Sequence, residues 1–283
     1  MKQLIVAIIL GFNALLSSAQ TQSDTTQKTT FIVAALYSTN ANYYGQSTEE
    51  KLPYVLTNAS VKFPGGLFLS ASAYKLINFG SGISAADASV GLETNLNKSE
   101  SLTGDISYSR SFYPENSPLI QAANENTVNA SLNYSWSWLN TSLTADYAFG
   151  KESDFFVSFS NSKEIALATF NDQAYISIEP AIEVVGGTQQ FYETYTTKKN
   201  LKDKVKDKIK NPLNPPGKGS TTTTTVASSS FDLLSYNLKL PVAYNRTHYM
   251  VEASCQLSIL GEKVETSSTR PRSFFNLSFY YLF

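Results

Sequence analysis

The last eleven residues of the chain, Ser273–Phe283, read SFFNLSFYYLF. Counted back from the end, every second residue is large and apolar or aromatic: Phe283, Tyr281, Phe279, Leu277 and Phe275. Successive side chains of a β-strand point to opposite faces, so this stretch predicts a strand with one apolar and one mixed face. In water such a terminal strand would be an adhesive edge, whereas in a lipid bilayer it suits the closing strand of a barrel.

The beginning of the chain has the features of a secretory signal peptide over residues 1–19. Lys2 is positive, an apolar run follows it, and Ser17, Ser18 and Ala19 form a small-residue cleavage site. We expect cleavage after Ala19 and a flexible periplasmic start over residues 20–30. Because no later stretch reaches roughly 18 consecutive apolar residues, a membrane-spanning mature chain is expected to be a barrel.

The composition narrows the function classes. The chain has 283 residues and a formal net charge of -1, so it lacks the basic field that nucleic-acid binding uses. The only cysteine is Cys255, which excludes an intramolecular disulfide.

The dominant hydrophobic period from Phe31 onward is two, which is typical of strands. In Val128–Trp138, for example, apolar and aromatic residues alternate with Asn and Ser. We predict a single barrel domain over residues 31–283, an all-β antiparallel up-and-down barrel of about twelve strands. The expected strands are 31–38, 54–63, 66–76, 84–95, 101–112, 127–138, 141–159, 164–170, 173–185, 232–244, 248–260 and 272–283. The boundary near Asn161 is the weakest, and ten or fourteen strands remain open.

The connections alternate in length. Every second one is tight and rich in turn-forming residues, such as Pro64-Gly65 and Asn171-Asp172. Most of the others are long, as expected of a barrel with short periplasmic turns and long external loops. Twelve strands would put both termini on the periplasmic side. A soluble β-sandwich is the alternative, but strands of about 10–12 residues favour a membrane barrel.

Aromatic residues flank the tight turns. Rings collect at the membrane–water interface, so we expect a periplasmic girdle of Phe63, Trp136, Trp138, Tyr244, Tyr249, Phe279, Tyr281 and Phe283. Pro180 falls inside a predicted strand, where it cannot donate a ladder hydrogen bond, and we expect a β-bulge there.

The terminal Phe283, with Tyr281, Phe279, Leu277 and Phe275 before it, resembles the C-terminal signature of bacterial outer-membrane β-barrel proteins. The resemblance implies a location in the cell outer membrane and recognition of this strand by the barrel-assembly machinery. A mature chain opening on Gln20 is similar to exported proteins of the Bacteroidota. The resemblance covers the mature chain in architecture and singles out no subfamily.

Acidic residues dominate the charges on the face predicted to line the interior. They are Asp87, Glu93, Asp105, Asp146, Glu179, Glu183 and Glu252, against Lys62 and Lys239. An acidic lining attracts cations and disfavours anions. Alternatively, some of these acids pair with Lys or Tyr inside a filled barrel, and a size of twelve strands does not decide between the two.

The long external loop, residues 186–231, carries a basic cluster of Lys198, Lys199, Lys202, Lys204, Lys206, Lys208 and Lys210. Leu201, Val205 and Ile209 recur every four residues, which suggests a short amphipathic helix. The loop could be a solvated, mobile segment. It could also bind phosphates of lipid head groups or lipopolysaccharide, or fold back and plug the acidic lumen.

Signals for catalysis are weak. His248 is the only histidine, and Met250 stands where an outer-membrane phospholipase would have a Ser two residues after its His. No transition-metal cluster, nucleotide fingerprint or cofactor motif is visible, so no catalytic, cofactor or metal residue is predicted. The sequence favours a narrow pore or passive transporter for small, cationic or neutral solutes. The alternative is a non-conducting structural or assembly barrel acting through its loops and partners. Outer-membrane lipids, lipopolysaccharide and the assembly machinery are the expected partners, nucleic acid is not, and the chain is a monomer or part of an unknown complex.

Overall fold

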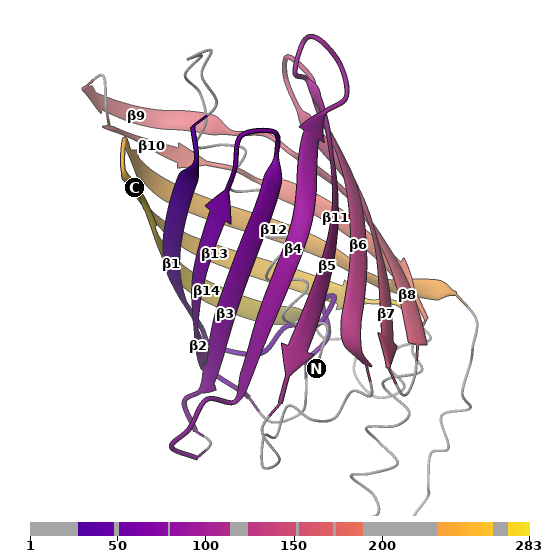
Figure 1. Ribbon diagram of the computed structural model, residues 1–283. Coiled ribbons are helices and arrows are strands. Elements are labelled where there is room, and N and C mark those ends of the chain that lie inside the picture. The colour runs from indigo at the N-terminus through magenta and orange to yellow at the C-terminus, as the bar shows by residue number, and fades with distance from the viewer. Residues whose placement is uncertain are drawn as a thin grey trace, which may run out of the picture.

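The structure is a computed structural model that describes residues 28–47, 51–78, 80–113, 124–150, 153–171, 174–188, 231–262 and 271–283. These residues form a β-barrel (Figure 1). No helix among them is long and apolar enough to cross a membrane.

The strands have the following bounds: β1 Thr30–Ser38, β2 Tyr54–Lys62, β3 Leu67–Leu76, β4 Ala85–Asn95, β5 Leu102–Phe112, β6 Asn124–Ser135, β7 Asn140–Gly150, β8 Ser153–Ser162, β9 Ile165–Asn171, β10 Ala174–Ile178, β11 Ala181–Gly187, β12 Asp232–Arg246, β13 Tyr249–Leu260 and β14 Arg272–Leu282. Sequence neighbours pair antiparallel from β1 to β8 and from β12 to β14. β1 also pairs with β14, and β11 pairs with both β8 and β12, which closes the wall.

The fourteen strands occupy twelve positions in this wall. β8 and β9 follow one another along one position, and β11 and β10 lie beside them along the next, because β10 pairs with β9 and β12. The predicted closed antiparallel barrel of twelve strands is therefore confirmed. We call the end at which β1, β3, β5, β7, β11 and β13 finish the long-loop end, and the opposite end the turn end.

The predicted strand 141–159, with its boundary near Asn161, is wrong, whereas the predicted strand 164–170 corresponds to β9 within one residue at each end. β7 ends at Gly150, and β8 pairs with it from Ser153 onward, so Asn161 lies inside β8. Tyr147 faces Phe155 and Ala145 faces Val157. The outward residues are odd-numbered in both strands. The apolar residues therefore recur at every second position through the turn as well, and the sequence pattern does not show where one strand ends and the next begins.

Two further expectations need correction. The sixth strand ends at Ser135, so Trp136 and Trp138 lie in the β6–β7 turn, where the Trp136 N–H donates to Leu139 O at 2.8 Å. The predicted bulge at Pro180 is also absent from the pairing of β10 and β11 with β12. Ile178 faces Val242 and Ala181 faces Lys239. The two strands thus have equal numbers of residues between these pairs, whereas a bulge would add one residue on the side of the proline.

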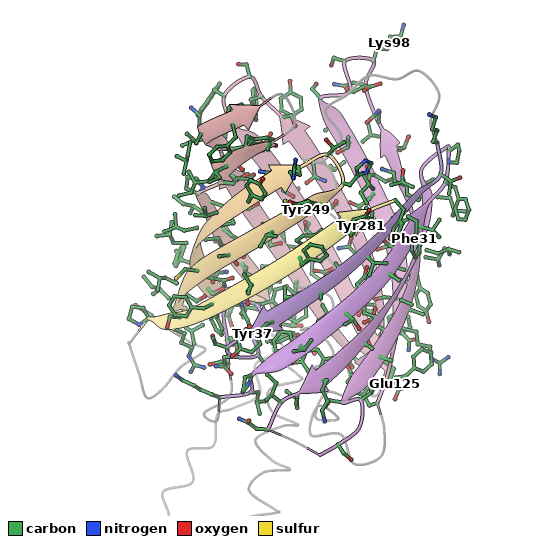
Figure 2. All side chains as sticks on the ribbon, turned by 90° about the vertical axis from the view of Figure 1, so that its left-hand side faces the viewer. Phe31, Tyr37, Lys98, Glu125, Tyr249 and Tyr281 are labelled. Atoms are coloured by element: carbon green, nitrogen blue, oxygen red, sulfur yellow. The ribbon has the colours of Figure 1, made fainter. Side chains whose placement is uncertain are left out.

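The outer surface of the wall is apolar. Alternate residues of nearly every strand project large side chains outward (Figure 2), among them Val33, Leu69, Val90, Ile106, Leu132, Leu143, Phe159, Leu238, Leu257 and Leu277. An exposed apolar area of this extent is unfavourable in water and is the surface that a membrane-spanning barrel presents to lipid.

Apolar side chains also gather inside the barrel at the long-loop end. Tyr54, Leu56, Tyr74 and Leu76 from β2 and β3 meet Phe156, Val185 and Leu234 from β8, β11 and β12 in one buried cluster. Tyr54 and Tyr74 stack with ring centroids 4.4 Å apart. This cluster is an apolar core enclosed by the wall. The interior of the barrel is therefore filled by large apolar side chains at its long-loop end.

β9 lies at the rim of the turn end. Among the described residues its only pairing partner is β10, so its other edge has no ladder. Its apolar side chains are exposed, with Leu167 at 57% and Phe170 at 61% of their full accessibility.

Candidate functional site

The inner face of β3 to β8 is lined mainly by short polar side chains. Buried members of this lining are Ser72, Ser89, Ser107, Ser109, Ser111, Thr127, Asn129, Ser131 and Thr144. They alternate with the outward apolar residues because each strand has a period of two. Each of these short side chains fills less of the cross-section than a Tyr, Phe or Leu of the cluster at the long-loop end.

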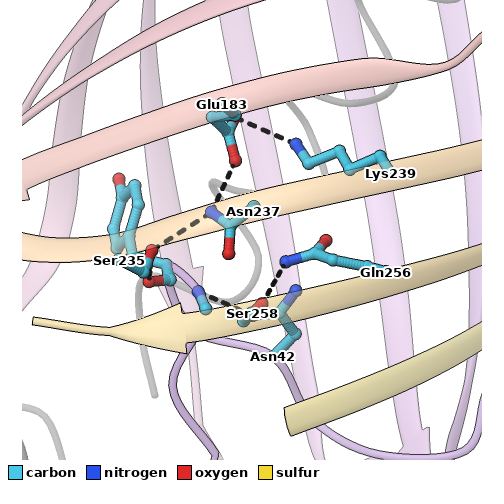
Figure 3. Close-up of polar contacts among 9 residues, drawn as sticks. Asn42, Glu183, Ser235, Asn237, Lys239, Gln256 and Ser258 are labelled. Carbon is cyan, nitrogen blue, oxygen red and sulfur yellow. Dashed lines mark hydrogen bonds and ion pairs between the residues drawn. The ribbon is translucent and has the colours of Figure 1, made fainter. Parts of the chain in front are cut away.

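Two of the predicted lining acids form ion pairs with the two predicted lining lysines. Glu93 on β4 lies 2.7 Å from Lys62 Nζ on β2, and Glu183 on β11 lies 2.9 Å from Lys239 Nζ on β12. Glu183 also accepts a hydrogen bond from Asn237 Nδ2 at 2.9 Å (Figure 3). These four charges therefore offset one another in pairs.

The other predicted acids carry no such counter-charge in the described part of the chain. Asp105 on β5 accepts from Ser131 Oγ, and Glu179 accepts from Ser162 Oγ at 2.7 Å. Glu252 on β13 is buried, and Asp87 on β4 is only 3% exposed. Asp105 and Glu252 lie toward the turn end of their strands, Glu179 directly follows β10, and Asp87 lies toward the long-loop end of β4, so negative charge is spread along the interior.

Sequence reasoning missed two charged residues of the interior. Asp154 on β8 is buried, and its carboxylate accepts from Thr188 Oγ1 at 2.9 Å and from Asn124 Nδ2 at 3.3 Å. Arg272, at the start of β14, donates to both the carbonyl oxygen and the hydroxyl of Ser47. Asp146 was identified because even-numbered residues of this region face inward. The same pattern would have identified Asp154 if the boundary between the two strands had been predicted correctly.

The connection from β1 to β2 enters the barrel. We call its described residues, 39–47 and 51–53, the inward loop. Tyr43 and Gln46 exchange backbone hydrogen bonds of 2.7 and 2.8 Å around Tyr44 and Gly45, whose φ values are 47° and 85°. Two positive φ values at these positions define a type I′ hairpin turn. Asn42 Oδ1 accepts from the Gly45 N–H at 2.9 Å and supports the turn.

The tip of the inward loop is buried against distant wall strands. The Tyr44 ring stacks on Phe156 of β8 with centroids 4.3 Å apart, and its hydroxyl donates to Asp146 Oδ2 of β7 at 2.7 Å. Asn129 donates to the other oxygen of Asp146 at 2.7 Å. Burial, and then the neighbouring Asp146, raises the pKa of Tyr44, so its hydroxyl stays protonated and remains a donor.

The same tip also contacts β12. Ser235 Oγ donates to the carbonyl oxygen of Tyr44 at 2.7 Å. Asn237, which bonds to Ser235 and Glu183, extends this contact into the ion pair with Lys239, and Asn42 lies in the same region (Figure 3). The inward loop is thus connected to the charged network of the interior.

The predicted girdle residues lie on the outer face or in the turns of the turn end. Ring centroids link Phe170, Tyr244, Tyr249 and Phe279 in steps of 6.2–6.3 Å. Phe283 lies 4.7 Å from Tyr281 and 5.4 Å from Phe31 (Figure 2 shows Tyr249, Tyr281 and Phe31). Trp136 Nε1 donates to Thr141 Oγ1 at 3.1 Å, Trp138 is exposed, and Phe63 is half-buried beside its turn.

The basic cluster Lys198, Lys199, Lys202, Lys204, Lys206, Lys208 and Lys210 lies outside the described residues. β11 ends at Gly187 and β12 begins at Asp232, so the long connection joins these strands at the long-loop end. The segment found inside the described barrel is the inward loop, which sequence reasoning had taken as an ordinary external connection.

No arrangement typical of an enzyme is present among the described residues. His248 lies in the β12–β13 turn, where its carbonyl oxygen accepts from Leu282 N at 2.7 Å. Cys255 is partly exposed, and the described residues contain no group of three metal-ligating side chains. The interior offers hydrogen-bonding groups, fixed charges and aromatic faces.

Comparisons with known proteins give the fold. The sequence matches no protein-family model and no curated protein. An outer membrane channel from Pseudomonas putida has a similar structure, with a TM-score of 0.51 and 10% identity over 93% of this chain and 98% of the channel. The KdgM porin has a TM-score of 0.49 and 8% identity over 88% of this chain and 98% of its own. LpxR from Salmonella typhimurium has a TM-score of 0.46 and 10% identity over 90% of this chain and 100% of its own.

At identities this low, the likeness shows the fold alone. The chain has the fold of bacterial outer-membrane β-barrel proteins. Together with the apolar exterior, this is the fold of a protein that resides in an outer membrane.

Proposed function

We propose that this protein is an outer-membrane pore or passive transporter for small solutes, with cationic and neutral solutes favoured over anions. The observation that carries the proposal is the inner lining of β3 to β8, where short Ser, Thr and Asn side chains replace the apolar ones of the outer face. Such a lining can hydrogen-bond a passing polar solute, whereas a barrel filled by its own side chains would leave no path.

The charge balance of the interior supports the proposed selectivity. Outside the pairs Lys62–Glu93 and Lys239–Glu183, the lining of the described barrel also holds the carboxylates of Asp87, Asp105, Asp146, Glu179 and Glu252. In a narrow space with low-dielectric walls, an excess of carboxylates concentrates cations and repels anions.

The proposal is tested by single-channel recording in planar bilayers under a KCl gradient. We expect discrete openings with a reversal potential on the cation-selective side. The recording should include the variant Tyr43→Ala/Tyr44→Ala, because these two side chains of the inward loop are packed inside the barrel. Silence of both proteins, after folding has been verified by heat-modifiable gel mobility, would contradict a pore.

A non-conducting barrel is the second candidate, and one observation favours it. The buried cluster of Tyr54, Tyr74, Leu76, Phe156 and Leu234 extends across the long-loop end and includes Tyr43 and Tyr44. If this core never opens, the barrel would act through its external loops and partners. Capture of a defined envelope protein by the silent barrel would support this function.

We also propose the interactions that the sequence suggests for the rest of the chain. The strand ending in Phe279, Tyr281 and Phe283 would be recognised by the barrel-assembly machinery, and the lysines 198–210 would bind phosphates of lipid head groups or lipopolysaccharide. We also propose an origin among the Bacteroidota, which Gln20 as the first residue of the mature chain suggests. Loss of assembly after deletion of Phe283, and loss of lipopolysaccharide binding after replacement of the lysines, would be the expected results.

A further inference from the structure

We propose that the inward loop is an autoinhibitory plug: it closes the barrel at the long-loop end, and passage of solute requires the loop to leave its seat. The inference rests on the proposed pore function, because a plug regulates a path that must exist. It concerns residues 39–47 and 51–53 and not the basic loop, which the sequence alone had suggested for this role.

The first argument is the reach of the loop. It leaves the wall between β1 and β2, yet Tyr44 contacts Asp146 on β7 and Phe156 on β8. In a wall of twelve positions, β7 lies directly across from β1, six positions away in either direction. A segment that joins two adjacent strands and touches the opposite side must cross the interior.

The second argument is how fully the crossing is filled. Tyr43 and Tyr44 are each only 7% exposed, and Tyr43 contacts both Tyr44 and Phe156 edge to face, at 4.9 and 5.8 Å. Around them the wall contributes Tyr54, Tyr74 and Leu234 to the same buried cluster. Close packing of this kind excludes water and small ions from that level of the barrel.

The third argument is that the loop can be displaced without breaking the barrel. Tyr43 and Gln46 make their backbone hydrogen bonds to each other, so the tip forms no ladder with the wall strands. Side-chain contacts hold it instead, at Asp146, Phe156, Ser235 and Arg272. At its base, Asn40 Oδ1 accepts from Leu52 N at 2.8 Å, which ties the two arms together and lets the tip move as a unit.

The experiment measures access to the seat beneath the loop. Ser235 is completely buried and bonds to Tyr44, so Ser235→Cys in a Cys255→Ser background places a nearly isosteric thiol directly under the tip. A small, water-soluble methanethiosulfonate reagent is added to the folded protein in detergent. We expect labelling at least tenfold faster when Tyr43→Ala/Tyr44→Ala is added.

Two controls accompany this measurement. Ser160→Cys, on the same inner face of β8 but nearer the turn end, should be labelled at the same rate with or without the loop tyrosines. Tyr236→Ala, on the outer face of β12, removes an equally large ring without touching the loop and should leave the Ser235→Cys rate unchanged.

The outcomes separate the plug from the pore. Equal Ser235→Cys rates in the two proteins overturn the plug, whatever current is measured. Faster labelling with a higher planar-bilayer conductance in the tyrosine variant supports both proposals. Faster labelling with no current in either protein supports occlusion by the loop and overturns the pore.

Discussion

Gly45 is the position at which the seating of the inward loop is most sensitive to one methyl group. A Cβ added there would lie 2.6 Å from both Cβ and Oγ of Ser235 and 2.7 Å from Asn237 Oδ1. The backbone at Gly45 also has a φ of +85°, a conformation that residues with a Cβ rarely adopt. Gly45→Ala should therefore drive the tip away from β12.

Two contributions set how strongly Gly45→Ala displaces the loop: the backbone strain at position 45 and the contact with Ser235. A left-handed backbone costs an L-residue about 1–2 kcal/mol, and since about 1.4 kcal/mol is tenfold in an equilibrium, this alone lowers the population of the hairpin turn that fits the seat by roughly 5- to 30-fold. The contact with Ser235 adds to it, because its Cβ is fixed to the backbone of a wall strand and cannot rotate away. We expect Ser235→Cys to be labelled at least tenfold faster in the Gly45→Ala variant.

Gly65 provides the matched control. Its φ is +89°, almost that of Gly45, but an added Cβ would meet nothing within 4 Å. Gly65→Ala therefore strains the β2–β3 turn without reaching the seat, and labelling at Ser235→Cys should stay at the parental rate. A parental rate in Gly45→Ala as well would refute the inference that this turn is pressed against β12.

Three further predictions use other contacts of the interior. Tyr44→Phe removes the 2.7 Å hydrogen bond to Asp146; a bond to a charged group contributes about 1.5–3 kcal/mol, so Ser235→Cys labelling should rise about tenfold or more, and a change under twofold would contradict the assignment. Lys62→Gln leaves Glu93 without its 2.7 Å ion pair, so the reversal potential in a KCl gradient should move toward cations; a move toward anions would show that Glu93 does not face the conducting path. Tyr74→Ala empties a site that is 1% exposed and stacked on Tyr54, and should lower the free energy of unfolding by about 3–5 kcal/mol in urea titrations, against a much smaller loss for the outward Tyr236→Ala.

The outer face of the barrel was predictable because one solvent acts on it along its whole length. Lipid selects large apolar side chains at every second position, as at Phe275, Leu277 and Phe279, and the alternation shows which strands exist. It does not show where they end. When the residues of a hairpin that face each other share parity, as Tyr147 and Phe155 do, the turn between them leaves no mark in the pattern.

The interior was predicted less completely, because the inner residues contact one another instead of a uniform solvent. The acidic residues at the inward-facing alternate positions were identified. The residues that pair with them depend on the register between neighbouring strands, which the sequence alone does not reveal. A signal for the apolar core was present: Tyr54, Val55 and Leu56 are apolar on both parities, which is typical of strands buried on both faces.

The inward loop also left a signal that could have been used. Two adjacent tyrosines before a glycine, in a connection otherwise rich in Asn, Ser and Glu, fit a hairpin turn that presents aromatic side chains for burial. What they pack against could not be inferred, since Asp146, Phe156 and Ser235 lie about 100 or more residues further along the chain.

The unladdered edge of β9 sets how deeply the barrel can sink into the bilayer. At that open edge the backbone N–H and C=O groups of alternate residues have no ladder partner among the described residues and need water or another strand. Hydrocarbon supplies neither. The acyl region must therefore stop before β9 begins, short of the level where the rings of Phe170 and Tyr244 meet. The wall extends further at β9 and β10 than at the β6–β7 turn that holds Trp136. This difference in height would incline the barrel axis to the membrane normal.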